Sequence, residues 1–200
     1  GDLFIDVGAN AGAFTILAGS KKAEVISFEP VNATFLKLKE NVRINCFEKI
    51  VTCMNAGVSN ENGVLLFTNI NIDTMNHVVE KSNSGEDTVQ VDVITLDNAL
   101  DRKEPFMLKI DVEGYEKKVL EGAKGILKNP KLHCVIMEVN GSGKRYGIQE
   151  KEILSIMKEY GFSMNTYNPF ERKLIKLSDT VTSIDNIIFT RNEEEIEKRL

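Results

Sequence analysis

The chain opens with Leu3-Phe4-Ile5-Asp6-Val7-Gly8-Ala9-Asn10-Ala11-Gly12, and Val25-Ile26-Ser27-Phe28-Glu29-Pro30 follows it. The short apolar run before Gly8 is typical of a buried parallel strand. Gly8 and Gly12 lack a β-carbon, which permits a tight turn and the close approach of a ligand. Residues 11–20 predict a helix whose first N–H groups face that turn. A second strand then ends in Glu29. This order indicates an α/β fold that holds an adenosine-containing cofactor.

The details of the turn distinguish two cofactors. A dinucleotide site has the pattern G-x-G-x-x-G, whereas this chain has Gly8-Ala9-Asn10-Ala11-Gly12-Ala13. The carboxylate of Asp6 would repel a pyrophosphate but suits the cationic amino-acid tail of S-adenosylmethionine. Glu29 follows the first glycine by about twenty residues, where a carboxylate bonds ribose hydroxyls in either case. The turn therefore favours S-adenosylmethionine, and the simpler alternative is that both acids are ordinary polar residues at strand ends.

Alternating strand and helix patterns along the rest of the chain predict a doubly wound, mainly parallel sheet. Residues 57–59 and 64–67 flank the turn sequence Asn60-Glu61-Asn62-Gly63, which predicts an inserted β-hairpin. The polar stretch 69–87 predicts a loop and candidate lid. Ligands of such sheets bind at the carboxyl ends of the strands, and this rule places four acids on one rim: Asp6, Glu29, Asp111 and Glu138.

The segment Lys109-Ile110-Asp111-Val112-Glu113-Gly114-Tyr115-Glu116 holds the second group of candidate residues. Lys109 interrupts an apolar strand, and a buried lysine needs an ionic partner. Side chains two apart share a face of a strand, so Lys109 and Asp111 are expected neighbours, with Glu138 ending the next strand. These three are the candidate catalytic residues, with Asp111 as the base that accepts the proton of an alcohol. Alternatively, Asp111, Glu113 and Glu138 hold a divalent cation such as Mg²⁺, or Lys109 and Asp111 form only a structural ion pair.

Composition limits the class of protein. A length of 200 residues favours one domain over residues 1–200, with the mostly charged stretch 191–200 as a solvated helix or frayed tail. The net charge of −5 argues against a nucleic-acid partner. Three cysteines without C-x-x-C spacing are typical of free thiols, and with no signal peptide or membrane span visible we expect a cytoplasmic protein. Because the first strand begins almost at Gly1, we also expect a natural N-terminal extension.

Taken together, these motifs resemble the FkbM family of S-adenosylmethionine-dependent methyltransferases. The matching segments run across most of the chain: Phe4–Gly12, Phe28–Pro30, Leu38 with Asn41 and Asn45, Asn55–Ser59, Val93–Asp97, Leu108–Glu116, Val119–Ala123 and Ile136–Glu138. The most specific signals are Lys109–Glu116 and the segment Val93–Asp97 before it. The glycine turn alone fits many methyltransferases.

The resemblance implies a Rossmann-like methyltransferase fold with a seven-stranded sheet whose last strand is antiparallel. It also implies transfer of a methyl group to a hydroxyl of a small molecule, sugar or glycan. By this resemblance the cofactor residues are Asp6, Gly8, Asn10 and Gly12 at the methionine part, Glu29 at the ribose, and Asn55 and Ala56 near the adenine. Family members differ in acceptor, so the acceptor's identity does not follow.

Two other functions stay open from the sequence. One is a non-catalytic module that binds S-adenosylmethionine or another nucleoside. The other is an NAD(P)-dependent oxidoreductase, although the chain lacks the dinucleotide glycine pattern and a Ser/Tyr/Lys catalytic spacing. His77, Tyr115 and Lys144–Tyr146 are weaker candidates: a solvated loop or a helix start explains each, although Lys144–Tyr146 could bind an acidic acceptor group.

Overall fold

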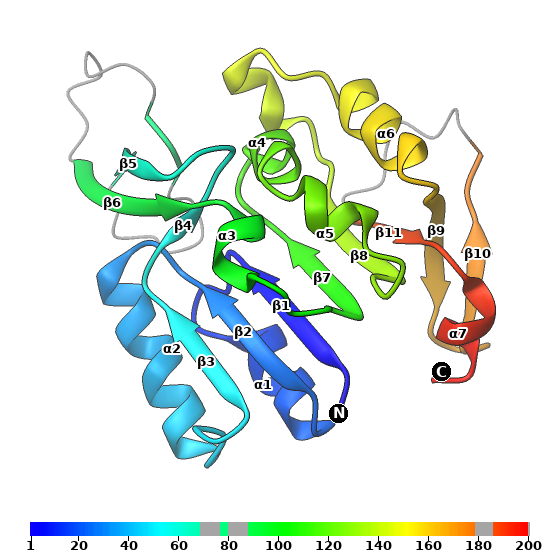
Figure 1. Cartoon of the computed structure of the whole chain (residues 1–200), viewed down its shortest axis with the longest axis horizontal. Helices are drawn as coiled ribbons and strands as arrows, with labels where there is room; N and C mark the ends of the chain where they lie inside the picture. Colours follow the sequence, from blue (N-terminus) through cyan, green and yellow to red (C-terminus); the bar gives the residue numbers. More distant parts are fainter. Residues whose placement is uncertain (69–76, 80–87, 179–185, 200) are drawn as a thin grey trace.

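The computed structural model describes residues 1–68, 77–79, 88–178 and 186–199, so most of the expected loop and candidate lid at 69–87 lies outside the described residues. The alternation of strands and helices predicted from the sequence is present (Figure 1). In chain order the elements are β1 Leu3–Val7, α1 Ala13–Ser20, β2 Glu24–Phe28, α2 Asn32–Ile44, β3 Val51–Met54, β4 Gly57–Val58, β5 Gly63–Thr68, β6 Thr88–Ile94, α3 Leu96–Leu100, β7 Met107–Ile110, α4 Glu116–Glu121, α5 Lys124–Lys128, β8 Cys134–Glu138, the 3₁₀ helix η1 Ser142–Tyr146, α6 Glu150–Glu159, β9 Ser163–Asn168, β10 Lys173–Lys176, β11 Asn186–Thr190 and α7 Glu193–Glu197.

The main sheet has eight strands in the order β10-β9-β11-β8-β7-β1-β2-β3. Strands β3, β2, β1, β7 and β8 are parallel, and β11 inserts antiparallel between β8 and β9. The doubly wound, mainly parallel sheet with an antiparallel last strand is therefore confirmed. The expected number of seven strands was wrong, because β10 adds an edge strand antiparallel to β9. Its four residues, Lys-Leu-Ile-Lys, carry lysines at both ends, as edge strands often do, and are too short to give a strong strand pattern.

A separate sheet of three strands has the order β4-β6-β5. The expected hairpin between residues 57–59 and 64–67 was wrong: β4 and β5 do not pair with each other, because β6 lies between them, parallel to β4 and antiparallel to β5. The turn after β4 is fixed to the end of β6. Ser59 donates its N–H to the Ile94 carbonyl at 3.1 Å, and Asn62 Oδ1 accepts the N–H of Thr95 at 2.9 Å. An alternating pattern shows which face of a strand is buried, but it does not identify the partner strand.

The two faces of the main sheet carry separate cores. Successive side chains of a strand point to opposite faces. Ile5 and Val7 of β1 belong to the larger core, which includes residues of α3, α4, α5 and α6. Phe4 belongs to a smaller core with residues of α1 and α2. Asp6, which alternates with Ile5 and Val7, therefore lies on the face that α1 covers.

Arg191 ties the end of β11 to loops at the same edge of the sheet. Its guanidinium donates to the backbone carbonyls of Leu127, Asn129, Leu132 and Tyr160. It also stacks on Phe162, with 4.5 Å from the guanidinium carbon to the ring centroid. Arginine is suited to this position because its planar group presents five N–H donors in a fixed geometry. The first residue of the expected charged tail is thus an internal anchor.

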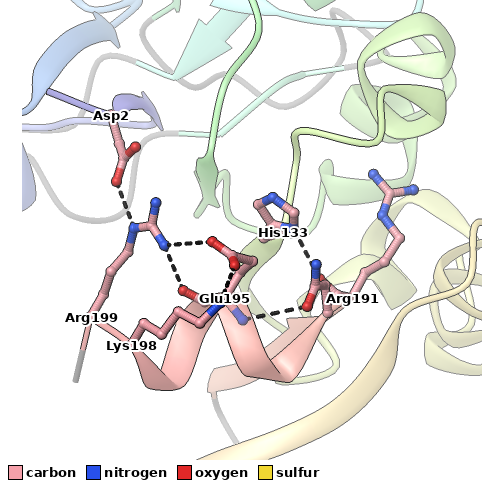
Figure 2. A network of polar contacts seen from close by, with 7 residues as sticks. Asp2, His133, Arg191, Glu195, Lys198 and Arg199 are labelled. Carbon is pink, nitrogen blue, oxygen red and sulfur yellow. Dashed lines mark hydrogen bonds and ion pairs between the residues drawn. The ribbon is translucent and has the colours of Figure 1, made fainter.

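The rest of the closing segment is docked on the chain (Figure 2). Asn192 caps α7 by accepting the N–H of Glu195, and Ile196 of this helix is buried. Arg199 pairs with Asp2 at 2.8 Å and lies 4.2 Å from the centroid of the Phe106 ring. The sequence predicts a solvated helix or frayed tail here. The helix is present, but it joins the end of the chain to its beginning.

Candidate active site

The register of the parallel strands places polar residues in two rows across the sheet. The inner row is Ser27, Asp6 and Lys109, on β2, β1 and β7. The outer row, two residues further along each strand, is Glu29, Gly8, Asp111 and Glu138. Residues two apart share a face of a strand, so the outer row continues the inner one at the carboxyl rim, beside α1. Three of the four acids that the sequence predicts at the rim are there, and Asp6 lies one row inside it.

Two glycines shape the turn between β1 and α1. At Gly8, φ is +75°, and a β-carbon would overlap the carbonyl oxygen of Asp111. At Gly12, φ is +94°, and a β-carbon would lie 2.6 Å from Cδ1 of Leu38 on α2. Asn10 between them has a φ of 51°, which asparagine tolerates better than most residues. The glycines therefore serve the close packing of the chain itself, while their predicted approach to a ligand stays a prediction.

Glu29 is oriented by the backbone around it. The residue is 6% exposed, and its two carboxylate oxygens accept the N–H groups of Asn10 and Val31, each at 2.9 Å. Asn55 donates from Nδ2 to the carbonyl oxygens of Glu29 and Pro30, at 2.9 and 3.0 Å. Glu29 thus joins the glycine turn to the end of β2, and Asn55 secures that end from the segment after β3.

A pocket opens at this rim, with apolar walls that include Phe28, Val58 and Phe67. Four of the seven predicted cofactor residues line it: Gly8, Asn10, Glu29 and Ala56. Asp111, Glu113 and Tyr115 line it as well. The other three predicted cofactor residues, Asp6, Gly12 and Asn55, do not; their contacts hold the segments that do. The pocket therefore spans the distance from the predicted ribose ligand to the predicted base.

Asp111, Glu113 and Glu138 form a cluster in which one oxygen of each lies within 4.8 Å of the others. Burial and the negative charge of Asp111 raise the pKa of Glu138 to about 7. Burial, and again Asp111, also raises the pKa of Glu113. Among the described residues Glu138 Oε2 is buried with no hydrogen-bond partner. Carboxylates this close resist full ionisation, so the cluster is suited to sharing a proton or to binding a cation.

The donor set of this cluster fits a hard divalent cation. Each side chain offers a carboxylate oxygen, which is the ligand type that Mg²⁺ prefers. A bound cation would also supply a partner to the buried Glu138 Oε2. The three predicted metal ligands are thus together, and two of them, Asp111 and Glu138, are also the candidate proton acceptors.

Lys109 is the cation of the site. Only 6% of its side chain is exposed, and its Nζ lies 3.1 Å from Asp111 Oδ2 and 3.6 Å from Asp6 Oδ1. The same Nζ donates to the Gly8 carbonyl at 3.3 Å and lies 5.0 Å from the centroid of the Phe14 ring. The expected pairing of Lys109 with Asp111 is present, and Asp6 is a second partner that the sequence did not predict.

Glu116 organises the loop that bears Glu113, a role that sequence reasoning missed. This buried side chain accepts the N–H groups of Gly114 at 3.1 Å and Val112 at 3.3 Å through Oε1. Glu113 and Gly114 both have positive φ, 55° and 100°. A β-carbon on Gly114 would lie 2.6 Å from the carbonyl carbon of Ser142, so the loop packs against η1. From sequence alone, Glu116 is explained equally well as an acid favoured at a helix start.

Two tyrosines connect the pocket to η1. Tyr115 lines the pocket and meets Tyr146 edge-on, with ring centroids 5.2 Å apart. The Tyr146 hydroxyl donates to the carbonyl of Val78 at 2.9 Å, and Val78 also lines the pocket. Three segments that are far apart in the sequence therefore meet here.

Two basic side chains act on the acidic cluster. The charges of Arg145 and His77 oppose the rise that burial causes in the pKa of Glu113, so both groups are near it. Arg145 belongs to η1, and His77 donates its backbone N–H to Thr68 Oγ1 at 3.0 Å. Arg145 and His77, which the sequence explains most simply as residues of solvated loops, thus flank the site.

Comparisons with known proteins agree with this arrangement. The family model of the methyltransferase FkbM domain matches residues 6–164. Hexuronic acid methyltransferase AglP of Haloferax volcanii is 30% identical over 161 residues, which are 79% of this chain and 62% of that protein. The chain therefore spans less than two thirds of this curated relative. No helix in the described parts of the chain has the length and apolar character needed to cross a membrane.

Solved structures share the fold at low sequence identity. The methyltransferase FkbM from Methylobacillus flagellatus KT has a TM-score of 0.61 and 16% identity, covering 95% of this chain and 43% of that one. SMU.1697c from Streptococcus mutans, in complex with SAH, has a TM-score of 0.52 and 14% identity, covering 95% of this chain and 88% of that one. These matches show that the sheet is of the Rossmann-like methyltransferase type.

Proposed function

Since the chain belongs to the FkbM methyltransferase family, we propose that it transfers the methyl group of S-adenosylmethionine to an oxygen of a carbohydrate or other small-molecule acceptor. The observation that carries the proposal is the outer row at the sheet rim. Glu29 and Asp111 line the same pocket, with Gly8 between them in the row. The proposed ribose-binding acid and the proposed proton acceptor would thus act in one site.

The cofactor is proposed to lie along the glycine turn. Glu29 would accept the ribose hydroxyls, as acids at this position of such folds do. Gly8 and Asn10 would contact the methionine part, and Ala56 would lie near the adenine. SMU.1697c, which has the same fold, is in complex with SAH, and this supports S-adenosylmethionine as the cofactor.

The transfer needs a base near the acceptor oxygen. The new bond joins that oxygen to the methyl carbon, the carbon–sulfur bond breaks, and its electron pair stays on sulfur. The acceptor's proton goes to Asp111, or to the pair that Asp111 forms with Glu138. Lys109 Nζ, 3.1 Å from Asp111 Oδ2, would hold this carboxylate in place for the proton transfer.

A divalent cation is the alternative way to activate the acceptor. Held by Asp111, Glu113 and Glu138, Mg²⁺ would lower the pKa of a coordinated hydroxyl. The geometry of the three carboxylates suits this role as well as proton transfer. Activity in the presence of a chelator separates the two: a base mechanism persists, and a metal mechanism stops.

The acceptor class is proposed from two observations. The relative at 30% identity is named for hexuronic acid, an acidic sugar. In this chain the guanidinium of Arg145 and the imidazole of His77 lie near Glu113 of the carboxylate cluster, where an acidic sugar would need basic groups. We therefore propose a sugar or glycan that bears a carboxylate, methylated on a hydroxyl.

Isothermal titration with S-adenosylhomocysteine (SAH), with NADH as the comparison ligand, is the first test. We expect micromolar binding of SAH alone. Binding of NADH but not SAH would contradict the cofactor assignment and favour an oxidoreductase.

The second test is transfer of a labelled methyl group to glucuronic acid, galacturonic acid and methyl glucoside, each with MgCl₂ or EDTA. Mass spectrometry and NMR of the product tell an ether from an ester. Asp111→Asn is expected to remove transfer but keep SAH binding, and Asp92→Asn, an exposed acid of β6, is the matched control. SAH binding with no product from a broad panel would support a non-catalytic binding module instead.

A further inference from the structure

Asp6 lies beneath the candidate site without reaching its pocket. The residue is 0% exposed, it belongs to the inner row, and it does not line the pocket. An effect of Asp6 on the reaction must therefore pass through its neighbours.

Two buried hydroxyls orient one oxygen of Asp6. Thr15 on α1 donates from Oγ1 to Asp6 Oδ2 at 2.6 Å, and Ser27 Oγ lies 2.7 Å from Thr15 Oγ1. A hydroxyl has one proton to donate, so Ser27 is the donor to Thr15 when Thr15 donates to Asp6. Both hydroxyl residues are 0% exposed. Helix α1 and strand β2 thereby leave Oδ1 to face Lys109.

Lys109 connects the oriented Asp6 carboxyl group to Asp111 at the rim. Its Nζ lies between Asp6 Oδ1, at 3.6 Å, and Asp111 Oδ2, at 3.1 Å. Because Asp6 and Lys109 are register partners on neighbouring strands, the sheet itself fixes their separation. The Gly8 carbonyl and the Phe14 ring bound the ammonium further. Asp6 Oδ1 has no hydrogen-bond partner among the described residues, so the Lys109 ammonium is the polar group that faces it. Without the Asp6 carboxyl group, Lys109 would lose its partner on the buried side and keep only those at the rim.

We propose that Asp6 is a positioning residue for methyl transfer, which acts by holding Lys109 where its ammonium sets the place of the Asp111 carboxylate. This inference rests on the proposed function, in which Asp111 accepts the proton of the acceptor. It gives Asp6 a different role from the cofactor ligand that the sequence predicts. A purely structural ion pair would use the same contacts, but it would leave the rate of transfer unchanged.

Three substitutions test the chain of contacts. Asp6→Asn keeps the size of the side chain. If the amide oxygen of the asparagine accepts the hydrogen bond from Thr15, its NH₂ group faces Lys109 in place of the carboxylate oxygen. Thr15→Val removes the hydroxyl that orients Asp6 and retains the Asp6 carboxyl group, so it serves if the Asp6 variant does not fold. Thr15→Ser restores the hydroxyl. Thr34→Val is the matched control, because Thr34 is equally buried and its hydroxyl has no hydrogen-bond partner among the described residues.

For each variant we would measure SAH affinity by titration, kcat with the acceptor that the wild-type protein uses, and a crystal structure with SAH. The inference predicts that Asp6→Asn lowers kcat more than about tenfold, since small misplacements of reacting groups cost this much. Thr15→Val lowers kcat less, and Thr15→Ser and Thr34→Val stay near the wild-type value. SAH affinity stays within about twofold throughout, because every substituted residue lies outside the pocket.

The outcomes are distinct. A parallel loss of SAH affinity in Asp6→Asn and Thr15→Val would overturn the inference in favour of a cofactor role for Asp6. An unchanged kcat would overturn it in favour of a structural ion pair. If the wild-type protein binds SAH but methylates nothing, the proposed function fails, and the crystal structures then test whether Asp6 positions Lys109. A Lys109 Nζ that stays within 4.0 Å of Asp111 in Asp6→Asn would overturn the positioning role. A displaced Nζ would support it.

Discussion

Glu138 and Asp111 end neighbouring parallel strands, and a carboxylate oxygen of each lies within 4.8 Å of the other. Burial and the charge of Asp111 raise the pKa of Glu138 to about 7. The pair therefore holds a proton below this pH and can accept one from an acceptor hydroxyl above it. We expect log kcat to rise with pH through a limb centred near 7.

Glu138→Gln tests this assignment, because the amide keeps the size of the side chain and cannot titrate. The limb near pH 7 should then disappear, because the group that titrates there is removed. The measurement is kcat between pH 5 and 9 at saturating cofactor. An unchanged limb in this variant would show that another group titrates there.

The same raised pKa predicts a change in stability with pH. Between the ordinary pKa of 4.5 and about 7, the folded state binds the Glu138 proton more tightly than the unfolded state does. Stability therefore falls as pH rises through this window, and the loss is complete above it. Relative to wild type, Glu138→Gln should gain about 3 °C in Tm on going from pH 5 to pH 8.

Glu48→Gln is the control for that experiment, because Glu48 is exposed on the chain before β3. Its difference from wild type should be the same at both pH values. A constant difference for Glu138→Gln as well would mean that the carboxyl of Glu138 is ionised in the folded protein at pH 5.

The closeness of Gly8 to Asp111 gives a second kind of prediction. Gly8→Ala places a β-carbon on the carbonyl oxygen of Asp111 and forces alanine to a φ of +75°. Both effects destabilise, and we expect a loss of about 3 kcal/mol in the free energy of unfolding, with weaker SAH binding. Gly63→Ala is the matched control, since a β-carbon there meets nothing within 4 Å. Equal stability of the two variants would contradict the close approach of the turn to β7.

The order of the site residues could be predicted from the sequence because each acid follows an apolar run. Strand-ending positions follow from period and length, so the sequence predicts Glu29, Asp111 and Glu138 at the rim, where the structure has them. The inward position of Asp6 could not be predicted. It depends on the register between strands and on Thr15, which lies on a helix whose rotation the pattern does not fix.

The sequence also does not show which strands pair with one another or which segments meet at the pocket. The period-two pattern found β5 and β6 but not that β6 separates β4 from β5. Likewise, η1 meets the pocket through Tyr146 and Val78, and no local signal relates residues so far apart. Local patterns gave the elements, and long-range contacts decided which polar residues serve the site.

Arg191 provides a prediction about stability alone. Alanine in its place leaves the carbonyls of Leu127, Leu132 and Tyr160 without this donor and removes the stacking on Phe162. We expect Arg191→Ala to lower the free energy of unfolding by about 3 kcal/mol. Arg199→Ala, which breaks the exposed contacts with Asp2 and Glu195 shown in Figure 2 and the contact with the Phe106 ring, should cost about 1 kcal/mol or less. Urea denaturation measures both, and equal losses would contradict the anchoring role of Arg191.

The last prediction concerns Glu116. It distinguishes an effect on the loop that bears Glu113 from an effect on the cofactor end of the pocket. Glu116→Ala leaves the N–H groups of Val112 and Gly114 without their acceptor, so Glu113 loses the support that holds its positive φ. We expect kcat to fall about tenfold and stability to fall by about 2 kcal/mol. SAH affinity should change little, because Glu29 is held by different groups.

Glu116→Gln keeps an oxygen that can accept both N–H groups, so it should recover most of the activity. Glu121→Ala, on the same helix, removes a half-buried pair with Lys118 and is the matched control for the helix itself. If Glu116→Ala and Glu121→Ala lowered kcat equally, the effect would belong to helix α4 and not to the loop. If Glu116→Ala weakened SAH binding as much as it slowed transfer, the two ends of the pocket would be coupled through this loop.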